Sequence, residues 1–330
     1  MADMGTRPGH GKLVTIFGGS GFVGRHTVRA LARDGWRVRA AVRRPDLAGH
    51  LQPMGNVGQI HAVQANVRYA ESVRAAVAGA DAVVNLVGIL APSGRQSFDA
   101  VHVDGAKAVA QATAQAGIGR FVHMSALGAD ADSGAQYARS KGIAEREVMK
   151  LLGDTIIVRP SIVFGPEDDF FNRFAKMAAS APVLPLIGGG RTRFQPVFVG
   201  DLAEAIANSC SGTGKAGTIY ELGGPEVYTF RQLLDQTQQW SGRNRGYVNL
   251  PFWAAKALAA LTWPLPSGLR PLTVDQVRML ATDNVVSDAA IAEGRTLETL
   301  GVAGAQSISA VVPSYLERFR PRGQFSHYRG

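Results

Sequence analysis

The sequence of 330 residues contains a single cysteine, Cys210, and this scarcity limits the chemistry open to it. One thiol excludes an internal disulfide bond and any zinc site built from several cysteines. It also fits a protein that works in a reducing compartment. We therefore expect Cys210 to be a small, inert side chain near the end of a helix rather than a reactive thiol.

A long uninterrupted hydrophobic run is also missing. The most apolar segment of the second half, residues 251–266, contains Lys256 and is shorter than the roughly 20 residues that a membrane-spanning helix needs. Residues 1–12 contain no apolar stretch of the kind found in signal peptides. We therefore expect neither a transmembrane helix nor a leader, and a cytoplasmic location.

Acidic residues are the minority among the charged side chains. The chain has 35 Lys and Arg against 26 Asp and Glu, which gives a net charge of +9. Such a surface suits nucleic acid, an anionic membrane or an acidic protein. Because no nucleic-acid-binding motif accompanies the charge, we exclude nucleic acid as a partner. The seven histidines show no HxxH or HxxxH spacing, so the sequence predicts no metal site.

Basic and aromatic residues alternate at the C-terminus. This tail is either a frayed, solvated end or a docking segment, and the sequence leaves both open. Its members are Arg318, Phe319, Arg320, Arg322, Phe325, Tyr328 and Arg329.

The first half alternates short apolar strands with helices. Residues 13–17 form a continuous apolar run, which is typical of a strand buried on both faces of a parallel sheet. A helix is expected from about Phe22 to Gly35, where glycine supplies the left-handed residue that ends it. The pattern predicts an α/β fold: a Rossmann-type doubly wound parallel sheet. Further strands are expected at 38–42, 82–86, 120–124 and 155–158, with helices at 72–77, 101–116 and 137–152.

The regularity loosens after Pro160. We expect residues 1–165 to form the nucleotide-binding core, and residues 166–330 to supply the last sheet elements and a smaller C-terminal lobe that is not an independent domain. Asp168 and Asp169 are expected to open a helix, and Asp201 to cap another. Strands are expected at 197–199 and 218–220, and loops at 188–190 and 264–271.

A glycine-rich loop follows the first expected strand directly. It reads Gly18-Gly19-Ser20-Gly21-Phe22-Val23-Gly24 and contains the pattern GxxGxxG. Gly18 allows a tight turn, Gly21 leaves room for a pyrophosphate, and Gly24 lets the helix pack closely on the sheet. The helix then presents its first amide groups and the positive end of its dipole to the phosphates. Between a strand and a helix, this loop predicts a dinucleotide site.

The end of the second strand indicates which dinucleotide binds. An NAD site usually has a carboxylate there for the ribose 2′-hydroxyl. This chain instead has Arg43 and Arg44, with no acid before Asp46. A guanidinium pairs with a 2′-phosphate that a carboxylate would repel. We therefore expect NADP(H) rather than NAD(H), with Arg43 as the better candidate and Arg44 either sharing the contact or pointing to solvent.

Tyr137 and Lys141 form a YxxxK motif within an expected helix. Residues four apart share one helix face, so the phenol and the ammonium can meet the same ligand. Lys141 would then lower the pKa of Tyr137 and make it usable as a proton donor or acceptor. Ser125, which ends the preceding strand, is placed to bind the same substrate oxygen.

These motifs resemble the extended or atypical branch of the short-chain dehydrogenase/reductase superfamily from Gly18 to about Gly224. The segments 85–88 (Asn85, Leu86, Val87 and Gly88) and 159–166, with Pro160 and Ile162, share the resemblance. It implies a cofactor site that includes these residues, and proton transfer by Ser125, Tyr137 and Lys141. The chain departs from the pattern at Asn66, where an adenine-binding aspartate is common, and at residues 103–106. These departures put turnover in doubt and leave nucleotide binding intact.

A closer resemblance is to the nucleotide-binding accessory subunit of respiratory complex I and its bacterial relatives. It is carried by residues 14–25, 51–59, 164–172, 195–199 and 282–284 with 300–302. It implies a structural NADPH, complex I subunits as partners and a peripheral position on the inner face of the bacterial plasma membrane. Residues 250–266 would then face the complex or anionic lipid, although Trp253, Leu258, Leu261 and Trp263 could equally pack on their own domain.

Three functions remain open at the level of sequence. The first is an accessory or assembly subunit of NADH:ubiquinone oxidoreductase with a structural cofactor. The second is a catalytic NADP-dependent reductase or epimerase/dehydratase that uses Tyr137 and Lys141, acting for example on a quinone or an isoprenoid precursor. The third is a regulator that senses the ratio of NADPH to NADP.

Overall fold

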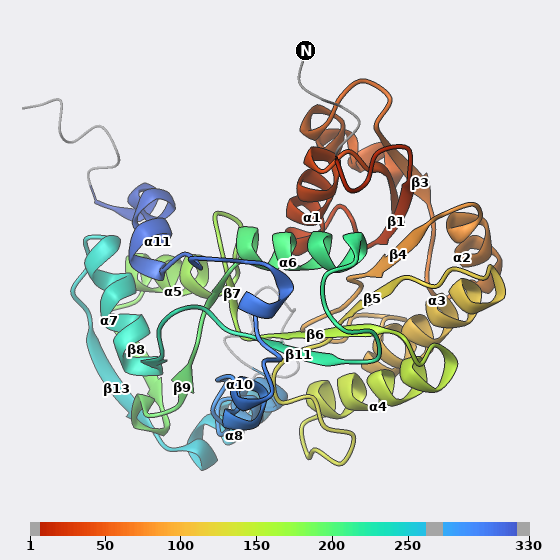
Figure 1. The fold of residues 1–330 in the computed structure, drawn as a ribbon. Coiled ribbons are helices and arrows are strands. Elements are labelled where there is room, and N and C mark those ends of the chain that lie inside the picture. Colours follow the sequence, from red (N-terminus) through yellow and green to blue (C-terminus); the bar gives the residue numbers. More distant parts are fainter. Residues whose placement is uncertain (1–6, 262–272, 322–330) are drawn as a thin grey trace, which may run out of the picture. The chain divides into compact units, whose positions relative to one another are not determined.

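The structure is a computed structural model that describes residues 7–261 and 273–321 (Figure 1). Its chain divides into two compact units. Unit 1 contains the residues up to Pro160 together with 199–222 and 286–303, and unit 2 contains 161–198, 223–285 and the residues from Gly304 onward. Both units are therefore assembled from segments that are distant in the sequence.

Unit 1 is built on a seven-stranded sheet in which every neighbouring pair is parallel. The strand order is β11-β6-β5-β4-β1-β2-β3. The order runs in opposite directions on the two sides of β1 and β4, as it does in a doubly wound sheet, and this confirms the predicted Rossmann-type fold. The strands are β1 (Leu13–Phe17), β2 (Arg37–Val42), β3 (Ile60–Gln64), β4 (Ala82–Asn85), β5 (Phe121–Met124), β6 (Ile156–Pro160) and β11 (Ile219–Leu222).

Helices cover both faces of this sheet (Figure 1). α1 packs against α6, and α3 packs against both α2 and α4. The longer helices are α1 (Phe22–Arg33), α2 (Ala70–Val77), α3 (Asp104–Gln115), α4 (Gln136–Leu151) and α6 (Val199–Ser211). Shorter turns complete the unit: η1 (Pro45–Leu47), η2 (Gly49–Met54), a π-helical turn η3 (Asp99–Val103), α10 (Asp288–Ala292) and η6 (Glu298–Leu300).

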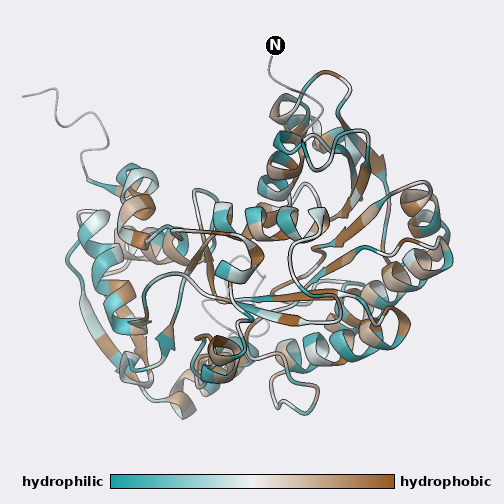
Figure 2. Cartoon of the chain, in the orientation of Figure 1, coloured by the Kyte–Doolittle hydropathy of each residue, from teal (hydrophilic) through white to brown (hydrophobic). Residues whose placement is uncertain are grey.

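The core of unit 1 follows from the apolar composition of its central strands, which Figure 2 colours mostly brown. Val14, Ile16 and Val84 have no exposed surface. At about 25 cal/mol per Å² of buried apolar area, such strands supply much of the driving force for folding. Residues 286–303 complete the opposite end of the sheet, where the Glu221 amide donates to the Arg295 carbonyl at 2.9 Å and the Arg295 guanidinium donates to the Ile219 carbonyl at 2.8 Å.

The strands and helices expected in the first half are present, with ends that differ by up to three residues. β3 was not predicted from the sequence. Its residues, Ile60–Gln64, include a histidine and a glutamine, and only Ile60 is buried because β3 is the last strand at one edge of the sheet. The helix expected at 101–116 is confirmed, but it is preceded by the π-helical turn.

Unit 2 combines two-stranded sheets with helices around an aromatic core. β7 (Val163–Phe164) pairs with β10 (Val197–Phe198), β8 (Val183–Ile187) with β13 (Gly246–Leu250), and β9 (Arg193–Phe194) with β12 (Tyr228–Thr229). Phe164, Phe171 and Phe230 are almost fully buried in this core. The helices are α5 (Phe170–Ser180), α7 (Phe230–Trp240), α8 (Phe252–Leu261), α9 (Val274–Met279) and α11 (Ile308–Leu316), with short turns η4 (Gly188–Gly190) and η7 (Glu317–Phe319).

The starts of two helices can be compared with those predicted from the sequence. The Asp168 carboxylate accepts hydrogen bonds from the amides of Phe171 and Asn172 at 2.7 and 3.2 Å, so this acid does open α5 as expected. The expectation for Asp201 was wrong, because α6 already begins at Val199, the residue expected to end a strand, and Asp201 lies inside its first turn. An acid in the first turn still interacts favourably with the helix dipole, which explains its position without a capping role.

Cys210 lies in α6 with 2% of its surface exposed, and burial raises the pKa of its thiol to about 12. It is the inert side chain that was expected. No helix within the described ranges is long and apolar enough to cross a membrane. The expected loop at 264–271, Trp263 and the tail residues Arg322, Phe325, Tyr328 and Arg329 lie outside the described residues.

Candidate functional site

The glycine loop leaves β1 at the point where the strand order of the sheet reverses. Gly18 has a φ of +83°, a left-handed conformation that strongly favours glycine. A Cβ atom on Gly18 would lie 3.2 Å from the carbonyl carbon of Leu86, so the loops after β1 and β4 meet here. Ligands of open α/β sheets bind in the crevice formed at such a reversal.

The other glycines of the loop have distinct environments. A Cβ atom on Gly24 would lie 2.1 Å from the Gly18 carbonyl oxygen and 2.8 Å from the backbone of Gly19, so only hydrogen fits there. A Cβ atom on Gly21 would approach only the Gly18 oxygen, at 3.3 Å, which leaves its outer side open. Close packing at Gly24 and open space at Gly21 are the features that a pyrophosphate-binding loop requires.

The start of α1 offers amide donors to a ligand. Gly21 precedes the helix without a side-chain cap, and the first intrahelical bond runs from the Arg25 amide to the Gly21 carbonyl at 3.0 Å. The amides of Phe22 and Val23 therefore have no acceptor within the helix. The first turn contains no acidic side chain to compete for them. These residues fit a diphosphate, which the positive end of the helix dipole would also attract.

Arg43 and Arg44, which follow β2, differ in their partners. The Arg44 guanidinium is bound by the carboxylate of Asp46, at 3.0 Å from Nε and 2.7 Å from Nη2. Arg43 donates from Nη1 to the neutral amide oxygen of Gln96 at 2.7 Å. Arg43 thus carries a charge that this contact does not neutralise, whereas Arg44 is already paired.

The segment after β4 lies beside both the glycine loop and α4. The Asn85 side chain is buried, and its oxygen accepts the Val87 amide at 3.2 Å. A methyl group on Gly88 would lie 3.5 Å from Lys141 Nζ, so this backbone runs beside the lysine. Asn66, which follows β3, uses its side-chain oxygen to accept the Arg68 amide at 3.2 Å.

Tyr137 and Lys141 lie in the first half of α4, as the YxxxK motif predicts. Lys141 is 2% exposed and donates from Nζ to the Met124 carbonyl at 3.1 Å, immediately before Ser125. Burial lowers the pKa of Lys141 to about 8, against the opposing charge of Glu145. Burial also raises the pKa of Tyr137 to about 12, and this corrects the expectation of a lowered value. Tyr137 is therefore a neutral phenol, suited to donating a proton rather than accepting one.

Ser125 and His123 are buried polar side chains in the region of this lysine. The Asn85 side-chain amide contacts His123 Nδ1 at 3.2 Å. His123 Nε2 and Ser125 Oγ have no hydrogen-bond partner among the described residues. Because an unsatisfied buried polar atom costs roughly 1–3 kcal/mol, the Ser125 hydroxyl is an atom that a ligand oxygen could satisfy.

His102, which the sequence did not single out, connects the two sides of the site. It lies in the π-helical turn, and its Nε2 accepts the Ile89 amide at 3.0 Å. Its Nδ1 lies 2.9 Å from Ser140 Oγ, which in turn donates to the Tyr137 carbonyl at 2.9 Å. These contacts require a neutral imidazole with the proton on Nδ1. Burial lowers the pKa of His102 to about 3, in agreement with this state.

His102 also packs against the phenol. Its ring is 5.5 Å from that of Tyr137 in an edge-to-face arrangement, and Phe98 lies 5.9 Å from the same ring. No HxxH pattern marks this histidine, so a motif search cannot find it. A π-helical turn is a common feature of functional sites, but it is visible only in the backbone.

Two residues expected in the cofactor site belong to different units. Pro160 ends β6 in unit 1, where its carbonyl accepts the Leu127 amide at 3.0 Å. Ile162 belongs to unit 2, and its amide donates to the side chain of Asn284 at 3.0 Å. Within the described part of the chain, no three histidine, cysteine or acidic side chains are grouped to hold a metal ion.

Comparisons with known proteins agree with this geometry. Residues 18–168 match the family of NAD(P)H-binding domains. The chain is 38% identical over 296 residues to NADH dehydrogenase [ubiquinone] 1 alpha subcomplex subunit 9 of Arabidopsis thaliana, covering 85% of this chain and 72% of that protein. It is 31% identical over 288 residues to a ceramide reductase of Caulobacter vibrioides, covering 86% and 88%. An NADPH-dependent quinone oxidoreductase of Escherichia coli, solved with NADPH, has the same fold, with a TM-score of 0.71 and 22% identity over 92% of this chain and 99% of that one.

Proposed function

Because the chain belongs to the family of subunit 9 of the NADH dehydrogenase 1 alpha subcomplex, and its residues 18–168 match the family of NAD(P)H-binding domains, we propose that it is an accessory or assembly subunit of NADH:ubiquinone oxidoreductase. Its nucleotide would then be mainly structural. A ligand that binds only the folded state stabilises that state by mass action, and a nucleotide present at 100 times its dissociation constant adds about 2.7 kcal/mol.

The observation that carries this proposal is the geometry of the glycine loop. The left-handed turn at Gly18, the hydrogen-only contact at Gly24 and the uncapped start of α1 together fit a diphosphate. In the proposed complex, the amides of Phe22 and Val23 bind its oxygens. When bound, the nicotinamide end would lie toward the carboxyl ends of β4 and β5, where Ser125 and Lys141 are found.

The experiment that tests this role is purification of the intact protein from its own cells under mild conditions. Co-migration with NADH:ubiquinone oxidoreductase on a native gel, together with retention of NADP(H) that exchanges slowly, is the expected result. A protein that migrates alone and exchanges its nucleotide within seconds contradicts a structural cofactor in that enzyme. A deletion strain complemented with the wild-type chain controls for unrelated losses of the complex.

Arg43 supports a preference for NADP(H). Its charge is not paired with an acid by its contact to Gln96, so Arg43→Ala is expected to weaken NADP⁺ binding by roughly 10- to 100-fold, the effect of losing a charge-assisted hydrogen bond. NAD⁺ has no 2′-phosphate, so its affinity should change little. Both affinities are measured by calorimetric titration.

The matched control for this prediction is Arg44→Ala. Since Asp46 already binds Arg44, its loss should reduce NADP⁺ affinity much less. An equal loss of NADP⁺ and NAD⁺ binding in Arg43→Ala would show that this residue does not distinguish the nucleotides.

The exposed apolar side chains of α8 support the proposal that unit 2 contacts a partner protein or a membrane. Trp253 and Leu261 are 75% and 80% exposed, and Leu258 is 43% exposed, whereas Ala255 and Ala259 are buried. Large apolar side chains with this exposure are typical of contact surfaces. With a net charge of +9, the chain is suited to an anionic lipid surface or to acidic subunits of the complex. We infer a peripheral position on the inner face of a bacterial plasma membrane.

Ser125 favours a second candidate, an NADPH-dependent reductase of a hydrophobic ketone or quinone. Its buried Oγ has no partner among the described residues, and it follows the carbonyl that holds Lys141. A bound reduced nicotinamide supplies a hydride to a carbonyl carbon. The Tyr137 phenol, kept neutral by burial, donates its proton to the carbonyl oxygen, and Ser125 donates a hydrogen bond to the same atom. The similarity to a ceramide reductase supports a substrate of this class.

Tyr137→Phe tests this candidate. If the phenol donates the proton, substrate-dependent oxidation of NADPH should fall by roughly 100-fold or more while nucleotide affinity is retained, since general acid catalysis contributes about 10²- to 10⁴-fold. The rate is followed at 340 nm, the absorbance of reduced nicotinamide, with a ceramide-type ketone and with a quinone. Tyr69→Phe, at a tyrosine that is 58% exposed, is the control. Equal rates in wild type and Tyr137→Phe exclude this mechanism.

A further inference from the structure

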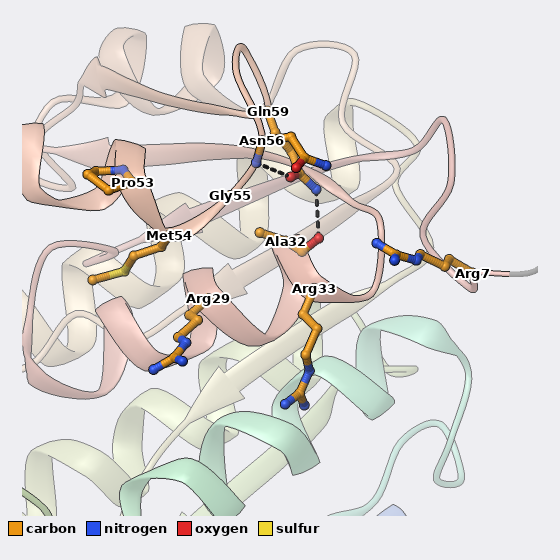
Figure 3. Close-up of a pocket in the computed structure, with 9 residues that line it drawn as sticks. All are labelled: Arg7, Arg29, Ala32, Arg33, Pro53, Met54, Gly55, Asn56 and Gln59. Carbon is orange, nitrogen blue, oxygen red and sulfur yellow. Dashed lines mark hydrogen bonds between the residues drawn. The ribbon is translucent and has the colours of Figure 1, made fainter. Parts of the chain in front are cut away.

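A pocket of about 320 Å³ lies on unit 1 at the C-terminal end of α1 (Figure 3). Three arginines, Arg7, Arg29 and Arg33, lie on one side of it. The other side is formed by residues 53–56 and Gln59, which belong to the segment 51–59 that carries part of the family resemblance. Neither the glycine loop nor the side chains of α4 line this pocket.

Two separate segments of the chain position the three arginines. Arg29 and Arg33 are four residues apart on α1, so they leave the same side of the helix, and Arg7 reaches toward them from the N-terminal segment (Figure 3). All three are exposed, and within the described ranges none of the guanidiniums makes an ion pair or a hydrogen bond. Three positive charges around one hollow repel each other unless an anion lies between them.

Acidic groups near the pocket do not offset this charge fully. No carboxylate is among the residues that line it. Two carboxylates lie nearby: Asp34 is close enough to interact with Arg33 and Arg7, and Glu204 interacts with Asp34, so two negative charges face three positive ones. The positive charge of the pocket therefore exceeds the nearby negative charge.

Gln59 makes the end of α1 compatible with an anion. The carbonyl oxygens at a helix C-terminus normally repel negative charge. Here Gln59 Nε2 donates to the carbonyls of Ala32 and Trp36 at 2.7 and 2.9 Å, and its Oε1 accepts the Asn56 amide at 2.8 Å. Figure 3 shows the contacts of Gln59 with Ala32 and Asn56, which hold this loop against the helix. The wall of the pocket is thus held in place before any ligand binds.

We propose that this pocket binds the phosphate group of an organic phosphate, either a soluble metabolite or a lipid headgroup. A phosphate carries up to two charges and three terminal oxygens, which match three guanidiniums, whereas one carboxylate would use only part of them. The volume lies at the lower end of the range for small-molecule sites. Pro53 and Met54 provide an apolar surface for the organic part of the ligand.

This site is distinct from the proposed nucleotide site. The glycine loop lies at the N-terminal end of α1 and the pocket at its C-terminal end, and a helix of 12 residues is about 18 Å long. Occupation of one site therefore leaves the other free, and the two proposals can fail separately.

The test uses the full chain with one equivalent of NADPH, so that the glycine loop is occupied while little free organic phosphate competes with the probe. Inorganic phosphate is titrated by calorimetry, and vesicles of phosphatidylcholine with and without phosphatidic acid are tested by flotation. Arg29→Gln and Arg33→Gln are each expected to weaken binding by roughly 10-fold. Arg37→Gln, an exposed arginine of β2 that does not line the pocket, removes the same charge and should change binding by less than about 2-fold, the effect of a solvent-screened charge that makes no contact with the ligand.

The two probes separate the sources of the phosphate. Arginine-dependent binding of inorganic phosphate supports a soluble ligand, and arginine-dependent binding to phosphatidic acid vesicles alone supports a lipid headgroup. Equal losses in Arg29→Gln, Arg33→Gln and Arg37→Gln, or no binding of either probe, overturn the proposal. The three variants replace exposed side chains, and their thermal unfolding confirms that each remains folded.

Discussion

Gly24→Ala is expected to weaken NADP(H) binding by at least roughly 100-fold and to lower the free energy of unfolding by about 1–3 kcal/mol. The added Cβ atom would lie 2.1 Å from the Gly18 oxygen and 2.8 Å from Gly19, and these neighbours are backbone atoms that cannot rotate away. Either the glycine loop or α1 must therefore move. Any such movement displaces the Phe22 and Val23 amides from a diphosphate. Calorimetric titration and urea denaturation measure the two effects.

Gly119→Ala is the matched control for this change. Gly119 is also in unit 1, its φ is not positive, and a Cβ atom there would meet nothing within 4 Å. This variant should bind nucleotide with wild-type affinity. If Gly24→Ala also binds normally, the close packing of the loop on α1 is not required for the site, and the main support for a nucleotide there is lost.

Acid should destabilise unit 1 through two buried histidines. Burial lowers the pKa of both His102 and His123 to about 3, while an unfolded histidine titrates near 6.5. Between these values the unfolded chain binds more protons, so stability is complete above pH 6.5 and is lost as the pH falls toward 3. At pH 5 the expected loss is roughly 2 kcal/mol for each histidine. The positive charge of Lys141 further lowers the pKa of both histidines.

The free energy of unfolding measured in urea at pH 7.5 and pH 5 tests this expectation. His102→Asn should reduce the pH-dependent loss by about half, since one of the two titrating groups is removed. His61→Asn, at an exposed histidine of β3, should leave the difference unchanged. A wild-type protein that is equally stable at both pH values would show that neither imidazole is held neutral by burial.

The sequence predicts the sheet of unit 1 well because its strands carry strong local signals. β1 and β4 are predominantly apolar, and a glycine-rich loop follows β1, so both the strands and the ligand-binding edge can be recognised. The sequence pattern of a strand is weak where the strand is only partly buried. β3 is exposed at the edge of the sheet, and the two-residue strands β7, β9, β10 and β12 depend on pairing between segments distant in sequence. No local pattern encodes such pairing.

The candidate site likewise has features that the sequence predicts and features that only the structure shows. The glycine loop, Tyr137 and Lys141 follow fixed spacings and are visible as motifs, but their electrostatics are not. The raised pKa of Tyr137 results from its burial, and the lowered pKa of Lys141 from burial opposed by Glu145. His102 joins three separate segments, through Ile89, Ser140 and the ring of Tyr137, and only the folded chain brings these together.

The division of unit 1 into three segments affects how the protein can be made. Residues 286–303 flank its seventh strand, β11. The unit is therefore complete only when nearly the whole polypeptide has left the ribosome. Until β11 has emerged, β6 presents an unpaired edge, which is prone to join other chains. During translation, a holding chaperone would therefore be most useful after the first six strands have emerged, and a truncated gene product ending near residue 165 should accumulate as aggregate.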